Sequence, residues 1–137
     1  MERIDLEGLP DCFLLRKILS PEECQKITEG AVHQENIETF NETGVYRRVM
    51  RIQVMQDDFA DWLYKVIKPY LPETYKVEKD EKEFGRLAEG VWEVDSLNPN
   101  LRFCKYDSSG FFKPHFDGTY LKSEDSRTFF TILLYLS

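Results

Sequence analysis

His115 and Asp117 are the residues whose types and spacing most clearly suggest chemistry. They stand two apart in the segment "GFFKPHFDG" (110–118). Residues two apart on a β-strand point to the same face, so a strand here would project the imidazole and the carboxylate together. Such a pair could supply two of the ligands in the two-histidine, one-carboxylate set that binds non-haem Fe(II). Taken alone, the pair is a weak signal, and a partly exposed histidine beside a turn-forming Asp-Gly explains it better.

The segments around this pair are predicted to be β-strands. We expect one strand at "LRFCKY" (101–106), a turn at "DSSG" (107–110), a second strand at "FFKPHFD" (111–117) and a third at "TFFTILLYLS" (128–137). The third segment is apolar on both faces, which is typical of a central strand covered on both sides.

The first half of the chain carries the signals of helices and of one further strand pair. After an expected strand at 13–19, Ser20 and Glu23 form a capping box with Pro21 at the first helical position. We expect this helix to end or weaken near Gly30. "NETG" (41–44) predicts a turn, and the segment at 45–54, which contains Arg47, Arg48 and Arg51, favours a strand.

The clearest helix is predicted at 57–72. Its apolar residues recur at three- and four-residue steps, which indicates one core-facing side; they are Phe59, Trp62, Leu63, Val66, Ile67 and Tyr70. Asp57 or Asp58 is expected to cap its start, and Pro69 and Pro72 to mark its end. Helices that precede a run of strands predict an α+β protein with helices packed on one face of a sheet.

Composition and charge argue against several classes of protein. The net charge of −7 over 137 residues argues against a general nucleic-acid binder, which needs clustered Lys and Arg. The longest apolar run, 129–136, is too short to span a membrane, and the first residues lack the pattern of a signal peptide. Three widely spaced cysteines read as free thiols in a reducing compartment, so we expect a cytoplasmic location, or a nuclear one.

From 98 to 136 the sequence resembles the prolyl 4-hydroxylase-like family of Fe(II)- and 2-oxoglutarate-dependent dioxygenases. The resemblance rests on "NPNLRFCKY" (98–106), "SSGFFKPHFDG" (108–118) and "SRTFFTILLYLS" (126–137). Upstream, "ILSPEECQKI" (18–27) and "GVYRRVMRIQV" (44–54) are similar to the family's leading helix and Arg-bearing strand.

This resemblance implies a jelly roll, the double-stranded β-helix, and specific roles for five residues. His115 and Asp117 would be metal ligands and catalytic residues, while Tyr106 and Tyr135 would line the 2-oxoglutarate pocket. Thr131, on the same expected strand face as Tyr135, would also line it. Both tyrosines could instead be strand aromatics that fill a half-buried sheet. The implied cofactors are Fe(II), 2-oxoglutarate as cosubstrate, and ascorbate, and the implied substrate is a prolyl residue of a protein or peptide.

The sequence departs from the family beyond Asp117. The family's second ligand histidine and the basic residue that pairs with 2-oxoglutarate lie further downstream than this sequence extends. The remaining histidine, His33, is expected to face solvent or cap a helix, and Arg127 and Lys122 lie in or beside the loop after Asp117. We therefore expect one incomplete domain over 1–137, with a helical support region at 1–97 and the first jelly-roll strands at 98–137.

Two other interpretations remain open. The chain could be a non-catalytic, truncated jelly-roll module that binds a partner through unpaired strand edges or the Arg-bearing strand, since such edges promote association. A cupin-type metal-binding jelly roll also tolerates His-x-Asp, but the motifs around the pair disfavour it.

Overall fold

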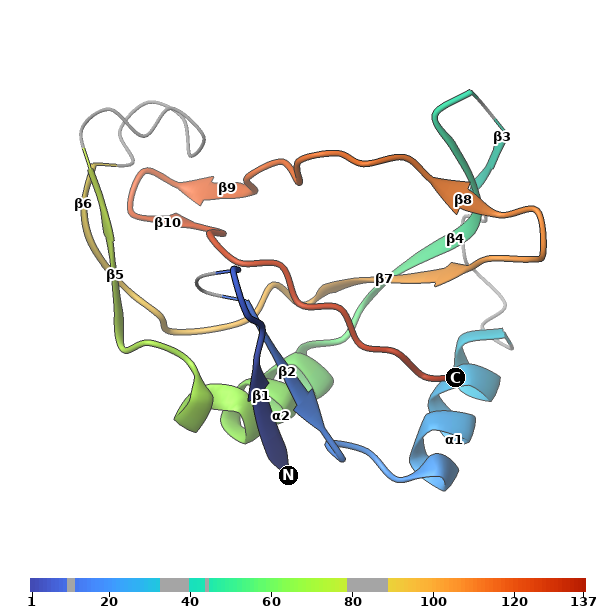
Figure 1. Ribbon diagram of the computed structural model, residues 1–137, viewed down its shortest axis with the longest axis horizontal. Coiled ribbons are helices and arrows are strands. Elements are labelled where there is room, and N and C mark those ends of the chain that lie inside the picture. The colour runs from blue at the N-terminus through green and yellow to red at the C-terminus, as the bar shows by residue number, and fades with distance from the viewer. Residues whose placement is uncertain (10–11, 33–39, 44, 79–88) are drawn as a thin grey trace.

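The computed structural model describes residues 1–9, 12–32, 40–43, 45–78 and 89–137. Over these residues the chain is mixed α+β, with two α-helices and several small antiparallel sheets (Figure 1). The predicted α+β class is confirmed. His33 lies outside the described residues. No helix in the described ranges has the length and apolar character needed to cross a membrane.

The first helix begins at the predicted capping box. Strands β1 (Glu2–Asp5) and β2 (Phe13–Arg16) pair antiparallel, and α1 (Pro21–Val32) comes next. The amide of Ser20 donates to the Glu23 carboxylate at 2.7 Å, and the amide of Glu23 donates to the Ser20 hydroxyl at 3.2 Å. These reciprocal bonds satisfy two amides at the open end of the helix. Gly30 does not end the helix, which continues to Val32.

The second helix, α2 (Asp57–Ile67), supplies much of the buried core. Ala60, Leu63 and Ile67 are its buried residues, at one-turn spacing on one face. The N-cap position is Gln56, without a side-chain cap bond, so the expectation that Asp57 or Asp58 caps the helix was wrong. Both aspartates lie in the first turn instead. The helix passes into a 3₁₀ turn, η1 (Lys68–Tyr70), that contains Pro69.

The largest sheet is built around one long strand. Strand β4 (Arg47–Met55) pairs antiparallel with β3 (Phe40–Thr43) on one side and with β7 (Asn100–Lys105) on the other. The predicted strands at 45–54 and 101–106 are confirmed. The turn predicted at 41–44 was wrong for 41–43, which belong to β3 because their backbone pairs with β4; residue 44 lies outside the described residues.

The strand β8 (Phe111–Phe112) continues along the same side of β4 as β7. Lys105 lies opposite Met50, whereas Phe111 and Phe112 lie opposite Arg48 and Arg47. The segment between β7 and β8 therefore bulges away from the sheet, and the two strands do not form a hairpin with each other. The second predicted strand, 111–117, is present only at Phe111–Phe112.

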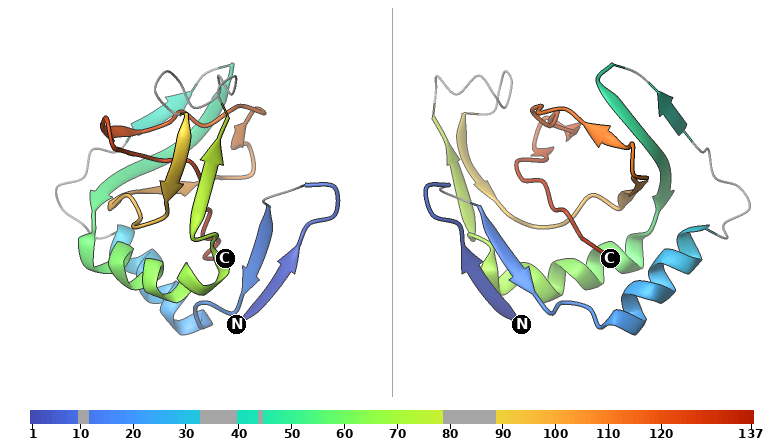
Figure 2. Two further views of the ribbon diagram at one scale, coloured as in Figure 1. Left: turned by 90° about the vertical axis from the view of Figure 1, so that its left-hand side faces the viewer. Right: turned by 45° about the vertical axis from the view of Figure 1, so that its right-hand side comes forward.

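Besides the β1–β2 pair, two further strand pairs lie apart from this sheet. They are β5 (Thr74–Val77) with β6 (Gly90–Glu93), and β9 (Leu121–Ser123) with β10 (Ser126–Arg127). The third predicted strand, 128–137, was wrong: the segment pairs with no strand in the described part of the chain, so it lacks the hydrogen bonds that define one. Figure 2 shows it running between the β5–β6 pair and β4.

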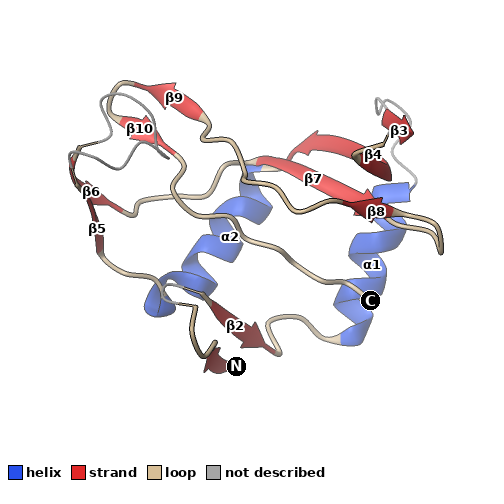
Figure 3. Cartoon of the chain, turned by 45° about the horizontal axis from the view of Figure 1, so that its top comes forward, coloured by secondary structure: helices blue, strands red, loops and turns tan. Residues whose placement is uncertain are grey.

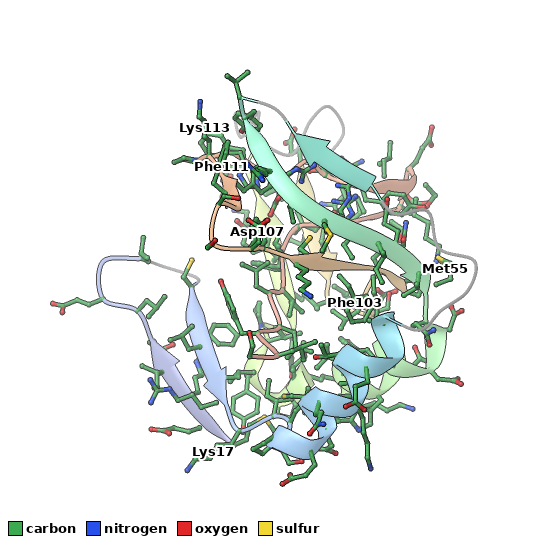
Figure 4. All side chains as sticks on the ribbon, turned by 90° about the vertical axis from the view of Figure 1, so that its right-hand side faces the viewer. Lys17, Met55, Phe103, Asp107, Phe111 and Lys113 are labelled. Carbon is green, nitrogen blue, oxygen red and sulfur yellow. The ribbon has the colours of Figure 1, made fainter. Side chains whose placement is uncertain are left out.

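The helices lie to one side of the β3–β4–β7 sheet (Figure 3). Figure 4 shows Phe103 on the side of β7 towards α1. Phe103 lies opposite Ile52 of β4, and strand residues alternate between faces, so Arg47 and its partner Phe112 occupy the other face. The side chain of Phe112, three residues before His115, therefore lies on the face away from the helices.

Candidate metal site

A backbone carbonyl fixes the protonation pattern of the His115 ring. Its Nδ1 lies 2.8 Å from the carbonyl oxygen of Lys113. A carbonyl oxygen only accepts hydrogen bonds, so Nδ1 carries the proton in this contact. In the neutral ring, Nε2 is then left with a lone pair and no hydrogen. The His115 side chain is 27% exposed.

The second residue of the pair is oriented from the C-terminal segment. The Thr131 hydroxyl donates to Oδ2 of Asp117 at 2.7 Å. The other carboxylate oxygen, Oδ1, lies 3.4 Å from Nε2 of His115. Thr131 thereby hydrogen-bonds one carboxylate oxygen of Asp117, and the other oxygen is the one that lies near the imidazole.

Two hydrogen-bond acceptors thus lie 3.4 Å apart, and a cation or a water molecule between them is needed to offset their repulsion. Either a second proton on the imidazole or a metal ion would meet that need. Nitrogen and oxygen ligands lie about 2.0–2.2 Å from a first-row metal ion, so neighbouring ligands of one ion are about 3–3.5 Å apart. The 3.4 Å separation fits this geometry, and imidazole with carboxylate suits Fe(II) among other divalent ions.

His115 and Asp117 reach this arrangement without the expected strand. Both lie beyond β8, in chain without regular secondary structure. Instead, two hydrogen bonds between Tyr120 and Thr128 close a loop in the chain, and this loop lies between Asp117 and Thr131. The Thr128 amide donates to the Tyr120 carbonyl at 3.0 Å, and the Tyr120 amide donates to the Thr128 hydroxyl at 2.9 Å.

The C-terminal segment is held against the β5–β6 pair by aromatic packing. The ring of Phe129 lies 5.7 Å from that of Tyr75 on β5 and 5.1 Å from that of Trp92 on β6, measured between centroids. Aromatic pairs at such distances contribute beyond their buried area. Phe129 precedes Thr131 by two residues, so this packing helps to fix where the Thr131 hydroxyl lies.

Three residues that pack on His115, or on the ring that stacks on it, were not predicted as site residues. They are Tyr46, Arg47 and Phe112. The Phe112 and His115 rings stack with centroids 3.5 Å apart, and Arg47 lies over the Phe112 ring. The Tyr46 ring meets both rings edge-on, and its hydroxyl lies 3.4 Å from the Pro114 carbonyl oxygen. Only the register between β4 and β8 brings these residues together, and sequence periodicity does not reveal that register.

Tyr106 and Tyr135 take no part in the contacts that join His115, Asp117 and Thr131. Tyr106 comes directly after β7 and is 45% exposed, while Tyr135 is 79% exposed in the C-terminal segment. Of the five residues proposed for the site, the described contacts therefore bring together the two candidate ligands and Thr131. Within the described ranges, no group of three or more His, Cys, Asp or Glu residues is placed to hold a metal ion.

The predicted turn at 107–110 is present and is organised by Asp107. The hydroxyl and amide of Ser109 donate to Oδ1 of Asp107 at 2.7 and 2.8 Å, and the amide of Gly110 donates to the Asp107 carbonyl at 2.9 Å. A Cβ atom at Gly110 would lie 3.0 Å from Cα of Tyr106, so the close approach favours glycine. The Ser109 hydroxyl and amide, with a smaller contribution from Arg48, lower the pKa of Asp107.

Acidification is expected to loosen this turn. Because the pKa of Asp107 is lowered by folding, its contribution is present above the unfolded value of about 3.9 and is lost as the pH falls through the lower folded value. The Ser109 amide resonance should therefore titrate below about pH 4 in NMR spectra. Ser109→Ala should move the midpoint upward, since one donor is lost. An unchanged titration in Asp107→Asn would contradict this assignment.

Comparison of the chain with protein-family models, with curated proteins and with solved structures finds no match.

Proposed function

We propose that this chain carries the metal-binding part of an Fe(II)- and 2-oxoglutarate-dependent dioxygenase of the prolyl 4-hydroxylase-like type, acting on a protein or peptide. One observation carries the proposal. Nε2 of His115 and Oδ1 of Asp117 face each other at 3.4 Å, while Nδ1 and Oδ2 are engaged by Lys113 and Thr131. The sequence motifs around the pair support the same assignment, and we propose that the sheets belong to a jelly roll, as in that family.

In this function His115 and Asp117 would hold Fe(II), which with 2-oxoglutarate and O₂ supplies C–H hydroxylation coupled to the release of succinate and CO₂. The Lys113 carbonyl keeps the proton on Nδ1 so that Nε2 can bind a cation. Thr131 restrains the carboxylate so that Oδ1 faces the same point. Both contacts limit the motion of the ligands before a metal arrives, which favours binding.

The remaining roles come from the resemblance. Tyr106 and Tyr135 would contact 2-oxoglutarate, ascorbate would keep the iron reduced, and a prolyl residue of the substrate would be hydroxylated. The three cysteines, Cys12, Cys24 and Cys104, are free thiols, which fits the proposed cytoplasmic or nuclear setting.

Metal titration of the chain tests the proposal. We expect Mn(II), followed by its electron spin resonance signal, to bind with one ion per chain and to be displaced by Fe(II). We also expect 2-oxoglutarate to tighten binding, because it would add ligands to the incomplete set. Absence of saturable binding with 2-oxoglutarate present, or undiminished binding by a His115→Ala/Asp117→Ala variant, would reject the metal site.

The exposure of the C-terminal segment favours a second candidate, a non-catalytic interaction module. Ile132, Leu133 and Tyr135 are 41%, 71% and 79% exposed, and such apolar surface is typical of a surface that binds another chain. The two candidates differ in the titration, because an interaction module that does not use the His-x-Asp pair gives no stoichiometric Mn(II) binding.

A further inference from the structure

We propose that Arg47 is a positioning residue for His115 and acts on it through the ring of Phe112. The inference deepens the proposed metal site, since it concerns how the histidine ligand is held. It rests on a continuous stack of guanidinium, phenyl and imidazole groups, which begins on β4 and ends at the candidate ligand.

Strand register places the first two members of this stack. Arg47 and Phe112 are direct partners in the antiparallel pairing of β4 with β8, so their side chains project from the same face. Cζ of Arg47 lies 4.3 Å from the centroid of the Phe112 ring, within the range of a cation–π contact. The planar guanidinium suits this position, because it can lie over an aromatic face.

Phe112 is contacted on both of its faces. The imidazole of His115 stacks on it with an interplanar angle of 23° and a centroid distance of 3.5 Å. A guanidinium at 4.3 Å could not share that face without overlapping the imidazole, so it covers the opposite one. The phenyl ring is therefore held between Arg47 and His115, and a shift of the ring would displace the imidazole.

The backbone next to the stack is also hydrogen-bonded to Tyr46, the residue directly before β4. The amide of Lys113 donates to the Tyr46 carbonyl at 3.1 Å, and the Tyr46 ring meets His115 with centroids 6.4 Å apart. The Lys113 carbonyl in turn accepts from Nδ1 of His115. Ring stacking and the Nδ1 contact together set the plane and rotation of the imidazole, and these decide whether Nε2 faces Oδ1 of Asp117.

The first readout needs no metal. The chain has two histidines, so the His115 ring signals are identified by their absence from spectra of His115→Ala. With the ring neutral, ¹⁵N shifts should show hydrogen on Nδ1 of His115, which lies 2.8 Å from the Lys113 carbonyl oxygen. Its ring protons should lie upfield because of the stacked phenyl ring. We expect Phe112→Leu to remove this shift, Arg47→Gln to reduce it, and Phe112→Tyr to keep it because the aromatic face remains.

The second readout is Mn(II) affinity. Phe112→Leu should weaken binding about 10-fold, as is typical for residues that support a metal ligand. Arg47→Gln should weaken Mn(II) binding by about two- to five-fold. This fold-change corresponds to the free energy of a partly exposed cation–π contact. Arg48→Gln is the matched control: it removes the same charge from the adjacent position, which faces the other side of β4 opposite Phe111, and should leave both readouts unchanged.

A double variant decides whether Arg47 acts through Phe112. If it does, Arg47→Gln has no further effect in the Phe112→Leu background, because the ring that transmits its influence is gone. An equal loss of affinity in both backgrounds, or unchanged His115 signals in Arg47→Gln, would overturn the inference. Failure of the proposed function looks different: the wild-type chain would bind no Mn(II), while the ring signals would still respond to Arg47→Gln.

Discussion

Replacing His115 or Asp117 by alanine is expected to lower Mn(II) affinity by more than about 100-fold, beyond the 10- to 100-fold loss typical of residues that only support a ligand. Nε2 of His115 and Oδ1 of Asp117 lie 3.4 Å apart, so either replacement leaves a single one of these two candidate ligands. A single imidazole or carboxylate competes poorly with water for a divalent ion. Electron spin resonance titration with Mn(II), with 2-oxoglutarate present, measures the change.

Two further variants provide comparisons for this loss of affinity. Thr131→Val keeps the shape of the side chain but removes the hydroxyl that donates to Asp117, and should weaken binding about 10-fold. His33→Ala removes the other imidazole of the chain and should leave affinity unchanged. Loss of binding in His33→Ala, with retention in His115→Ala, would move the metal away from the His-x-Asp pair.

Leu63→Ala is expected to cost about 2–4 kcal/mol in the free energy of unfolding, as for other buried leucines. Leu63 is 5% exposed on the inner face of α2, between Ala60 and Ile67, which are 2% and 3% exposed. Few residues in the described ranges are this deeply buried, so the cavity removes a large part of the core. Urea unfolding followed by circular dichroism provides the measurement.

Asp61→Ala is the matched control for this substitution. Asp61 lies on the exposed side of the same helix, so the change should alter the free energy of unfolding by less than about 0.5 kcal/mol. Comparable losses in both variants would contradict the role of Leu63 in packing, because alanine is the best helix former and neither change weakens the helix itself.

Local signals predicted elements well where the relevant interactions are close in sequence. The capping box of Ser20 and Glu23 forms as predicted, because both partners lie within one helical turn. The apolar stripe that includes Leu63 and Ile67 likewise identified the buried face of α2. The cap at Asp57 or Asp58 failed because the helix starts one residue after Gln56, whose amide donates to the Pro99 carbonyl, a contact distant in sequence.

The arrangement of the site could be predicted only in part. The same-face argument for His115 and Asp117 assumed a strand, whereas their convergence comes from Thr131 and the Lys113 carbonyl. The turn at 107–110 is consistent with either a reversal of the chain or a bulge, and only the pairing of β8 with β4 distinguishes them. The apolar character of 128–137 likewise could not show whether a partner strand lies beside it.

The β9–β10 pair gives the chain a place to change length near the candidate ligands. The bonds between Tyr120 and Thr128 close the base of this hairpin, and its turn lies at Glu124 and Asp125. Residues inserted at the turn would extend the hairpin outward, and each doubling of loop length costs only about 0.6 kcal/mol. Such a change in length would leave the bond between Asp117 and Thr131 in place.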